Sequence, residues 1–339
     1  MKIIRNILVV GFVVLIAGSA FGQEKPALRE VDRVRLAEAF RLSDQLGDEL
    51  WAGWSKAPFA VLLVTPEREF LVGHPRASED FTSLGYDALL KSELYYRDRK
   101  FQPNLLATFP AVGGISTIVI GQAENTASKT STPWVITLMH EHLHQLQDFQ
   151  PNFFKETEAL NLSGGDQTGM WMLNFPFPYE KADVSRQVSL LTRLLLEGMD
   201  AKTDAQFSSK LASYLEAREA LKKMLSSDEY KYLSFQLWKE GIARYTEDRV
   251  AHWAAEKYQP SRAFRELKDF TSFAAVAAQV RKGTVHELST LKLEEYKRVA
   301  FYPIGAAEGL LLDRANPKWR TQYFARKFDN EKYFPATRN

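Results

Sequence analysis

Three of the six histidines in this 339-residue chain lie close together, in the run His140-Glu141-His142-Leu143-His144. Composition alone would produce roughly 0.01 such His-Glu-x-x-His patterns in a chain of this kind, so the run is informative. Helix residues four apart share a face, so His140 and His144 can direct their imidazole nitrogens at one divalent ion, such as zinc. Glu141 lies about 100° around the helix and can reach a water beside that ion as a general base.

The middle histidine and the missing thiols bear on what kind of site this is. His142 points about 200° away from His140 on a helix, so we expect it to be packed or hydrogen-bonded; a group facing a substrate is the alternative. A structural metal site or a chance match are the other interpretations of the run. Structural zinc usually takes four protein ligands, often thiolates, and the chain has no cysteine. The pattern therefore favours a catalytic zinc site.

A catalytic zinc ion needs a third protein ligand and an open fourth position. The metzincin arrangement requires glycine and histidine where this chain has Gln147 and Gln150, so that class is excluded. The short spacings of other zinc peptidases require glutamate where Ser163 and Gly164 stand. The third ligand must therefore come from further along the chain.

Glu240 is the candidate for that ligand. It lies within a long predicted helix over residues 228–257, between Trp238 and Ile242 and next to Gly241. The small side chains at Gly241 and Ala243 would let this helix approach the histidine helix closely. The alternative for Glu240 is an ordinary solvated helix position, and the other candidate ligands are Glu308, Glu156 and Glu158.

The histidine run has the surroundings that a metal-binding helix needs. A β-branched segment over residues 115–120 predicts a strand, and a polar loop over 124–131 follows it. The next helix is predicted over 132–149, with Thr132 as N-cap, Pro133 at the first helical position and Pro151 ending it.

The rest of the chain divides into a mixed first part and a helical second part. A helix is predicted over 26–47, a hairpin from strands 59–64 and 70–72, and a further strand over 94–97. The later helices are predicted over 181–199, 204–225, 228–257, 270–282 and 303–312. We therefore expect an α+β protein: a mixed α/β lobe with a small sheet over 23–150, then an α-helical lobe over 151–339, with a cleft between them.

These features resemble the gluzincins, zinc metallopeptidases of the thermolysin-like superfamily. The resemblance rests on the His140–His144 run and, less specifically, on Glu240-Gly241-Ile242-Ala243-Arg244-Tyr245, and it covers residues 115–250. It implies a zincin-like fold, a Zn²⁺ ion held by His140, His144 and Glu240, and a strand at 115–120 that forms the sheet edge where a peptide substrate adds as a further strand.

The chain departs from that family in two ways. The gap from His144 to Glu240 is far longer than the short spacings. Arg244 also stands where many gluzincins carry an aspartate that orients a ligand histidine, so that support must come from elsewhere, and Glu247 is a candidate.

Peptide hydrolysis also needs a donor for the tetrahedral oxyanion. The candidates are Tyr245, Tyr302 and His252, although Tyr302 and His252 also suit plain packing positions. The aromatic-rich segment over residues 171–179 is interpreted as packing between lobes, or as a loop over the cleft.

The N-terminus and the overall charge indicate where the protein works. Lys2 and Arg5, an apolar run over 7–17 and Ala20-Phe21-Gly22 form the pattern of a cleaved signal peptide over 1–22; a retained anchor is the alternative. Its loss would leave 42 basic residues (44 minus 2) against 42 acidic ones, which gives no electrostatic case for nucleic acid.

We therefore expect a periplasmic or secreted protein without stable membrane insertion. The predicted function is a zinc-dependent peptidase acting on peptides or proteins. The alternatives are a non-catalytic zincin-like binding protein and a metal-dependent hydrolase of a non-peptide amide or ester.

Overall fold

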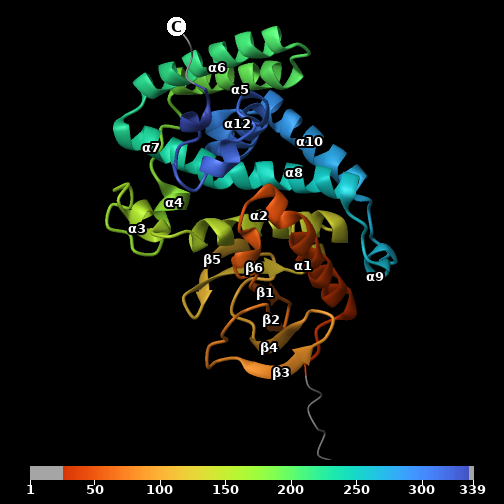
Figure 1. Ribbon diagram of the computed structural model, residues 1–339. Helices are drawn as coiled ribbons and strands as arrows, with labels where there is room; N and C mark the ends of the chain where they lie inside the picture. Colours follow the sequence, from red (N-terminus) through yellow and green to blue (C-terminus); the bar gives the residue numbers. More distant parts are fainter. Residues whose placement is uncertain (1–25, 336–339) are drawn as a thin grey trace, which may run out of the picture.

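The computed structural model describes residues 26–335. The predicted signal peptide, residues 1–22, lies outside the described residues. Among the residues that are described, no helix is both long and apolar enough to cross a bilayer. Figure 1 shows a β-sheet at one end of the molecule and a group of helices at the other, with helix α2 (Ser131–Phe149) packed between the two. The predicted α+β class is confirmed.

Six strands form one sheet in the order β3-β4-β2-β1-β6-β5. All neighbours are antiparallel except β1 and β6, which are parallel. The strands are β1 (Val61–Val64), β2 (Arg68–Val72), β3 (Thr82–Asp87), β4 (Ser92–Asp98), β5 (Leu106–Val112) and β6 (Ile115–Gly121). The predicted hairpin and the predicted strands at 94–97 and 115–120 are thereby confirmed, whereas β3 and β5 were not predicted.

One expectation about the sheet is wrong. The strand at 115–120, β6, is not the sheet edge, because it lies between β1 and β5. The edge beside α2 is β5, which contains Pro110 and an irregular register between Phe109 and Val112. Proline has no N–H for a strand ladder and is tolerated at a sheet edge, so the residue that hid this strand from sequence analysis also fits its position.

Twelve α-helices are described, with short 3₁₀ turns between them. They are α1 (Glu30–Leu50), α2, α3 (Phe153–Glu158), α4 (Trp171–Asn174), α5 (Ala182–Asp200), α6 (Asp204–Met224), α7 (Ser227–Gln236), α8 (Ile242–Lys257), α9 (Arg262–Arg265), α10 (Phe273–Thr290), α11 (Leu293–Tyr296) and α12 (Phe301–Ala315). The 3₁₀ turns are Trp54–Lys56, Ala123–Asn125, Lys297–Ala300, Trp319–Gln322 and Asn330–Tyr333. The predicted helices are present with shifted ends, and one of them is interrupted: a π-helical turn, Leu237–Gly241, separates α7 from α8.

The start of α2 also differs from the prediction. Thr132 is not the N-cap, because the helix begins at Ser131 and follows Thr130. A carboxylate from a distant segment takes the capping role: Asp269 accepts hydrogen bonds from the backbone N–H and the hydroxyl of Ser131, at 3.0 and 2.6 Å. A negative group at a helix N-terminus is stabilising. The hydroxyl of Thr132 instead donates to the carbonyl oxygen of Thr271.

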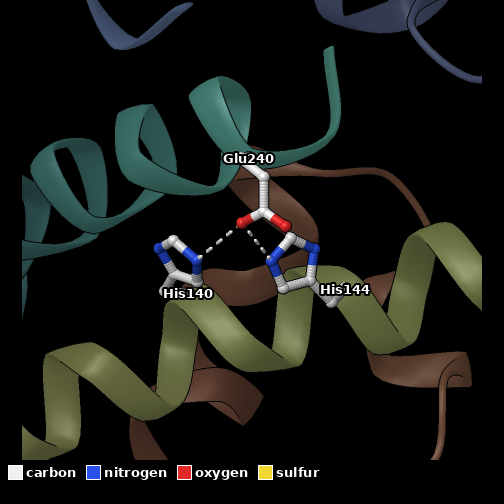
Figure 2. A group of neighbouring side chains, drawn as sticks. All are labelled: His140, His144 and Glu240. Carbon is white, nitrogen blue, oxygen red and sulfur yellow. Dashed lines mark ion pairs between the residues drawn. The ribbon is translucent and has the colours of Figure 1, made fainter. Parts of the chain in front are cut away.

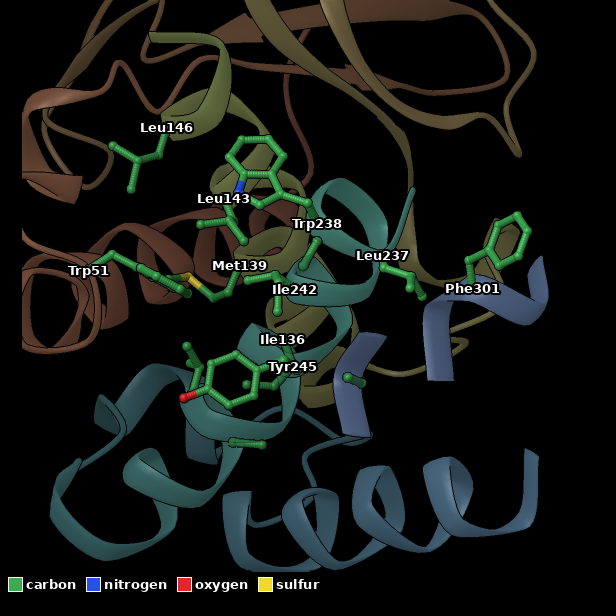
Figure 3. Close-up of a cluster of buried hydrophobic side chains, with 14 of the residues drawn as sticks. Trp51, Ile136, Met139, Leu143, Leu146, Leu237, Trp238, Ile242, Tyr245 and Phe301 are labelled. Carbon is green, nitrogen blue, oxygen red and sulfur yellow. The ribbon is translucent and has the colours of Figure 1, made fainter. Parts of the chain in front are cut away.

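A single apolar core joins the two halves of the chain through α2. Ile136, Met139 and Leu143 on α2 face Trp238 and Ile242 of the second half (Figure 3). On β1, Val61 and Leu63 belong to this core, whereas Leu62 and Val64 point to a smaller cluster on the opposite sheet face. This core contains residues from both before and after position 150, so it does not separate two lobes there. The predicted lobe boundary at residue 150 stays a prediction.

Gly241, next to Glu240, makes a different helix–helix contact from the predicted contact with the histidine helix. Gly241 packs against Gly305 of α12 and not against α2: a Cβ on Gly241 would lie 2.4 Å from the Gly305 Cα. Two helix backbones can approach this closely only where side chains are absent. The contact therefore fixes α12 against the π-helical turn.

We expect Gly241→Ala to destabilise the protein by about 1–3 kcal/mol, because the added methyl group forces the two backbones apart. Gly283→Ala, on α10, is the matched control. A Cβ added at Gly283 would have no heavy atom within 4 Å, so we expect a gain of about 0.4–1 kcal/mol from lower chain entropy in the unfolded state. Urea denaturation measures both; equal effects of the two substitutions would contradict the packing described here.

Candidate metal centre

His140, His144 and Glu240 converge at the contact between α2 and the π-helical turn. Figure 2 shows the Glu240 carboxylate directed at the two imidazoles. Its Oε2 lies 3.3 Å from His144 Nε2 and 3.9 Å from His140 Nε2. All three ligand atoms lie within 4.8 Å of one another. A tetrahedral ion with bonds of about 2.0–2.1 Å holds its ligands about 3.3–3.4 Å apart, so the three groups would have to draw closer together to share one zinc ion, which stays a prediction.

The far nitrogens of the two histidines differ in their surroundings. His144 Nδ1 lies 2.7 Å from Gln147 Oε1, and the Gln147 amide donates to Tyr323 Oη at 2.7 Å and to the Lys239 carbonyl oxygen at 3.2 Å. His140 Nδ1 is buried 3.5 Å from Glu247 Oε1 and has no hydrogen-bond partner in the part of the chain that the structure describes. The Gln147 contact fixes the orientation of the His144 ring and leaves its Nε2 directed at Glu240.

Of these two supports, the sequence indicated only Glu247. On sequence grounds, Gln147 was only a departure from the metzincin pattern. Its spacing of three residues from His144 on one helix was the available signal.

The centre combines burial with opposed charges. Burial disfavours the charged form of Glu240, but His144 and His140 outweigh it and hold the pKa of this carboxyl well below its usual value. Burial likewise opposes protonation of His140, yet Glu240, Glu247 and Glu141 together raise the pKa of its imidazole. The surrounding carboxylates therefore favour positive charge at this position, which suits a divalent cation.

Glu141 faces the edge strand of the sheet. Thr108, on β5, donates a hydrogen bond to Glu141 Oε2 at 2.6 Å. His142, by contrast, is packed as expected. Its ring stacks on Phe59 with centroids 3.9 Å apart, its Nδ1 lies 2.9 Å from Gln145 Oε1, and burial lowers its pKa to about 3.

Of the two tyrosines expected at the site, the structure brings only one there. The Tyr302 ring stacks on His140 at 6.1 Å between centroids, and its hydroxyl accepts a hydrogen bond from Arg298 Nη1 at 2.9 Å. The expectation for Tyr245 is wrong: its hydroxyl donates to Asp313 at 2.8 Å, within the core.

The other sequence candidates also lie elsewhere. His252 Nδ1 lies 2.7 Å from the Asp248 carbonyl oxygen on its own helix. Glu308 is buried against Arg218 and bonded to Tyr214. Glu156 pairs with Lys327, and Glu158 is exposed.

The aromatic segment over residues 171–179 packs, as its main interpretation predicted. Phe175 stacks on Tyr232 at 4.5 Å between centroids, and Phe177 lies edge-on to Phe301 at 5.3 Å. The cleft expected between the halves stays a prediction. A hollow of about 420 Å³ lies elsewhere, between the start of α1 and the β1–β2 turn.

Comparison with protein-family models, with curated proteins and with solved structures found no match to this chain.

We expect the protein to bind one zinc ion per chain. His144→Ala and Glu240→Ala should each remove stoichiometric zinc, because each deletes a ligand. Gln147→Ala should weaken affinity about 10–100-fold through loss of ring orientation. His286→Ala is the control, since His286 is exposed on α10. Elemental analysis and competition with a chelating dye measure this; undiminished zinc in either ligand variant contradicts the assigned centre.

Proposed function

We propose that this protein is an exported zinc-dependent peptidase with a zincin-like arrangement. The observation that carries the proposal is the convergence of His140, His144 and Glu240, with Glu141 one residue along the same helix. Zinc held there would act as a Lewis acid on a substrate carbonyl and lower the pKa of a water molecule. The remaining chemistry belongs to side chains of this chain.

Glu141 is the proposed general base. It takes the proton from the attacking water and later delivers it to the leaving amine. Thr108 occupies one carboxylate oxygen, Oε2, and so orients the group and leaves Oε1 for the water. An intact, oriented Glu141 argues against a purely metal-binding role, because binding zinc does not need that residue.

Tyr302 is the proposed donor to the oxyanion. Burial and the nearby Glu240 carboxylate raise the pKa of the Tyr302 phenol well above its usual value, so the hydroxyl is protonated at neutral pH and can donate a hydrogen bond. Arg298 already donates to the Tyr302 oxygen, so the hydroxyl proton points to an acceptor; that acceptor is Glu240 here and would be the oxyanion in the proposed reaction. The Tyr302 ring lies beside the His140 ring, which supports a role for this residue next to the proposed metal ligands. A preorganised donor of this kind stabilises charge that develops in the transition state.

The sheet edge supports a peptide substrate over a small ester. Within residues 26–335, strand β5 pairs with β6 and with no other strand, and it borders α2. An extended peptide can add to such an edge through backbone hydrogen bonds. Thr108 lies on β5 and touches Glu141, so a peptide on this edge passes next to the proposed base.

We expect Glu141→Gln to keep stoichiometric zinc and to lower peptide hydrolysis by about 10²–10⁴-fold, because the amide cannot accept the proton. Zinc content and turnover of a fluorogenic peptide library, with and without chelator, test this. Retained turnover in the zinc-loaded variant would reject Glu141 as the base.

The two tyrosines form a matched pair for the oxyanion role. Tyr302→Phe should lower kcat by about 10²-fold or more with zinc binding intact. Tyr245→Phe should instead cost about 1–3 kcal/mol of stability, since it removes the hydrogen bonds that the buried Tyr245 hydroxyl makes with Asp313 and Arg320, and should keep kcat. Steady-state kinetics and urea denaturation separate them; a kcat loss confined to Tyr245→Phe would reverse the assignment.

A further inference from the structure

Two arginines lie around Tyr302 beside the candidate metal centre. The Arg298 guanidinium carbon lies 5.4 Å from the centre of the Tyr302 ring, and that of Arg244 lies 6.0 Å from it. Arg298 Nη1 also lies 3.7 Å from Glu240 Oε1. Arg244 comes from α8, and Arg298 from the 3₁₀ turn before α12. Two cationic groups from separate segments therefore meet next to the metal ligands.

Both guanidinium groups keep donors to spare. Among the described residues, Arg298 donates one side-chain hydrogen bond, to Tyr302, and its other nitrogens are not among the buried unpartnered atoms. Arg244 donates none; its Nε lies 3.3 Å from Glu247 Oε2 without hydrogen-bond geometry. The side chains are 21% and 30% exposed, more than any of the three candidate ligands. The spare donors are therefore within reach of a bound molecule.

Two of the carboxylates near these arginines, Glu240 and Glu247, have other partners in the proposed zinc-bound centre, whereas Glu287 also lies close enough to act on the charge of Arg244. Glu240, which faces Arg298, is the third ligand, and a carboxylate on a divalent ion gives up much of its negative charge. Glu247, which faces Arg244, supports His140. The arginines are then left as partly exposed cations with unsatisfied N–H groups. Guanidinium forks of this kind bind carboxylates through paired hydrogen bonds.

We propose that Arg298 and Arg244 bind a carboxylate of the substrate close to the bond that is cleaved. The inference rests on the proposed function and narrows its substrate class. The preferred peptides carry either a free C-terminal carboxylate or an acidic side chain next to the cleaved bond. Arg298 and Arg244 would thus determine specificity, while Glu141 and Tyr302 act on the reacting atoms.

The test uses zinc-loaded protein and peptides in matched pairs. A peptide that the wild type cleaves is made with a C-terminal acid or amide, and with Glu or Gln at each position flanking the cleaved bond. We expect one carboxylate form to have a kcat/KM at least about 10-fold higher than its neutral partner, mainly through KM. The acid–amide pair and the Glu–Gln pairs distinguish the two sources of the carboxylate.

Variants locate the effect. Arg298→Gln and Arg244→Gln should each reduce the carboxylate preference at least about 5-fold, and Arg298→Lys should keep part of it through its charge. Arg262→Gln is the control, because Arg262 is 85% exposed on α9 and pairs only with Glu266 among the described residues. Stoichiometric zinc in the arginine variants shows that the centre remains folded. Cleavage without any carboxylate preference overturns the inference and leaves the peptidase proposal standing.

A binding measurement separates the two proposals. Calorimetry follows glutarate, a small dicarboxylate, on zinc-loaded wild type, Arg298→Gln and Arg262→Gln. We expect binding that Arg298→Gln weakens at least about 10-fold and that Arg262→Gln leaves unchanged. This result without cleavage of any peptide would support the carboxylate site and reject the peptidase. Absent or unaltered glutarate binding, together with no carboxylate preference, rejects the site.

Discussion

The close approach of two helix backbones at Gly241 and Gly305 determines the geometry of the candidate centre. Gly241 follows Glu240 directly, and Gly305 lies three residues after Tyr302, which is about one helical turn. Contact between these glycines therefore brings the carboxylate and the phenol to neighbouring positions. The π-helical turn contributes as well, because its wider turn shifts the side chains that follow relative to a regular helix. The relative placement of Glu240 and Tyr302 thus rests on this backbone contact.

Helix α2 connects the candidate centre to the sheet through two histidine–glutamine pairs, each with a spacing of three residues. His142 pairs with Gln145, whose amide donates to carbonyl oxygens of Ala60 and Ser116 on the sheet side. Two residues along, His144 pairs with Gln147, whose amide donates to Lys239 on the helical side. A buried amide without a hydrogen-bond partner would cost free energy. Each glutamine amide therefore has carbonyl acceptors, and these bonds attach α2 to the sheet through Gln145 and to the helical half through Gln147. The histidine run is consequently fixed by hydrogen bonds to both the sheet and the helical half of the chain.

The sequence predicted the features that depend on residues near one another in the chain, and it missed those that depend on contacts between distant segments. The prediction that His140 and His144 lie together follows from helix geometry alone. Glu240 could be predicted because its neighbours in the sequence are small or apolar. The edge strand β5 was missed because Pro110 and its partly exposed residues resemble a loop. The π-helical turn has no comparable signature. Tyr245 was misplaced because its partner, Asp313, lies 68 residues away and its role depends on that contact. Arg298 was missed for the same reason, since its proposed role depends on its contacts with both Tyr302 and Glu240.

The arrangement also constrains how a substrate would lie. Thr108 and Glu141 stand toward the sheet edge, whereas Tyr302 and Arg298 stand with α12 and the turn before it. The His140, His144 and Glu240 side chains are only 8%, 6% and 14% exposed. Low exposure strengthens every electrostatic interaction at the centre, because little water screens it. In the proposed peptidase, a scissile carbonyl would enter between β5 and Tyr302, where strand pairing on one side and a carboxylate contact with the arginines on the other would hold it in register.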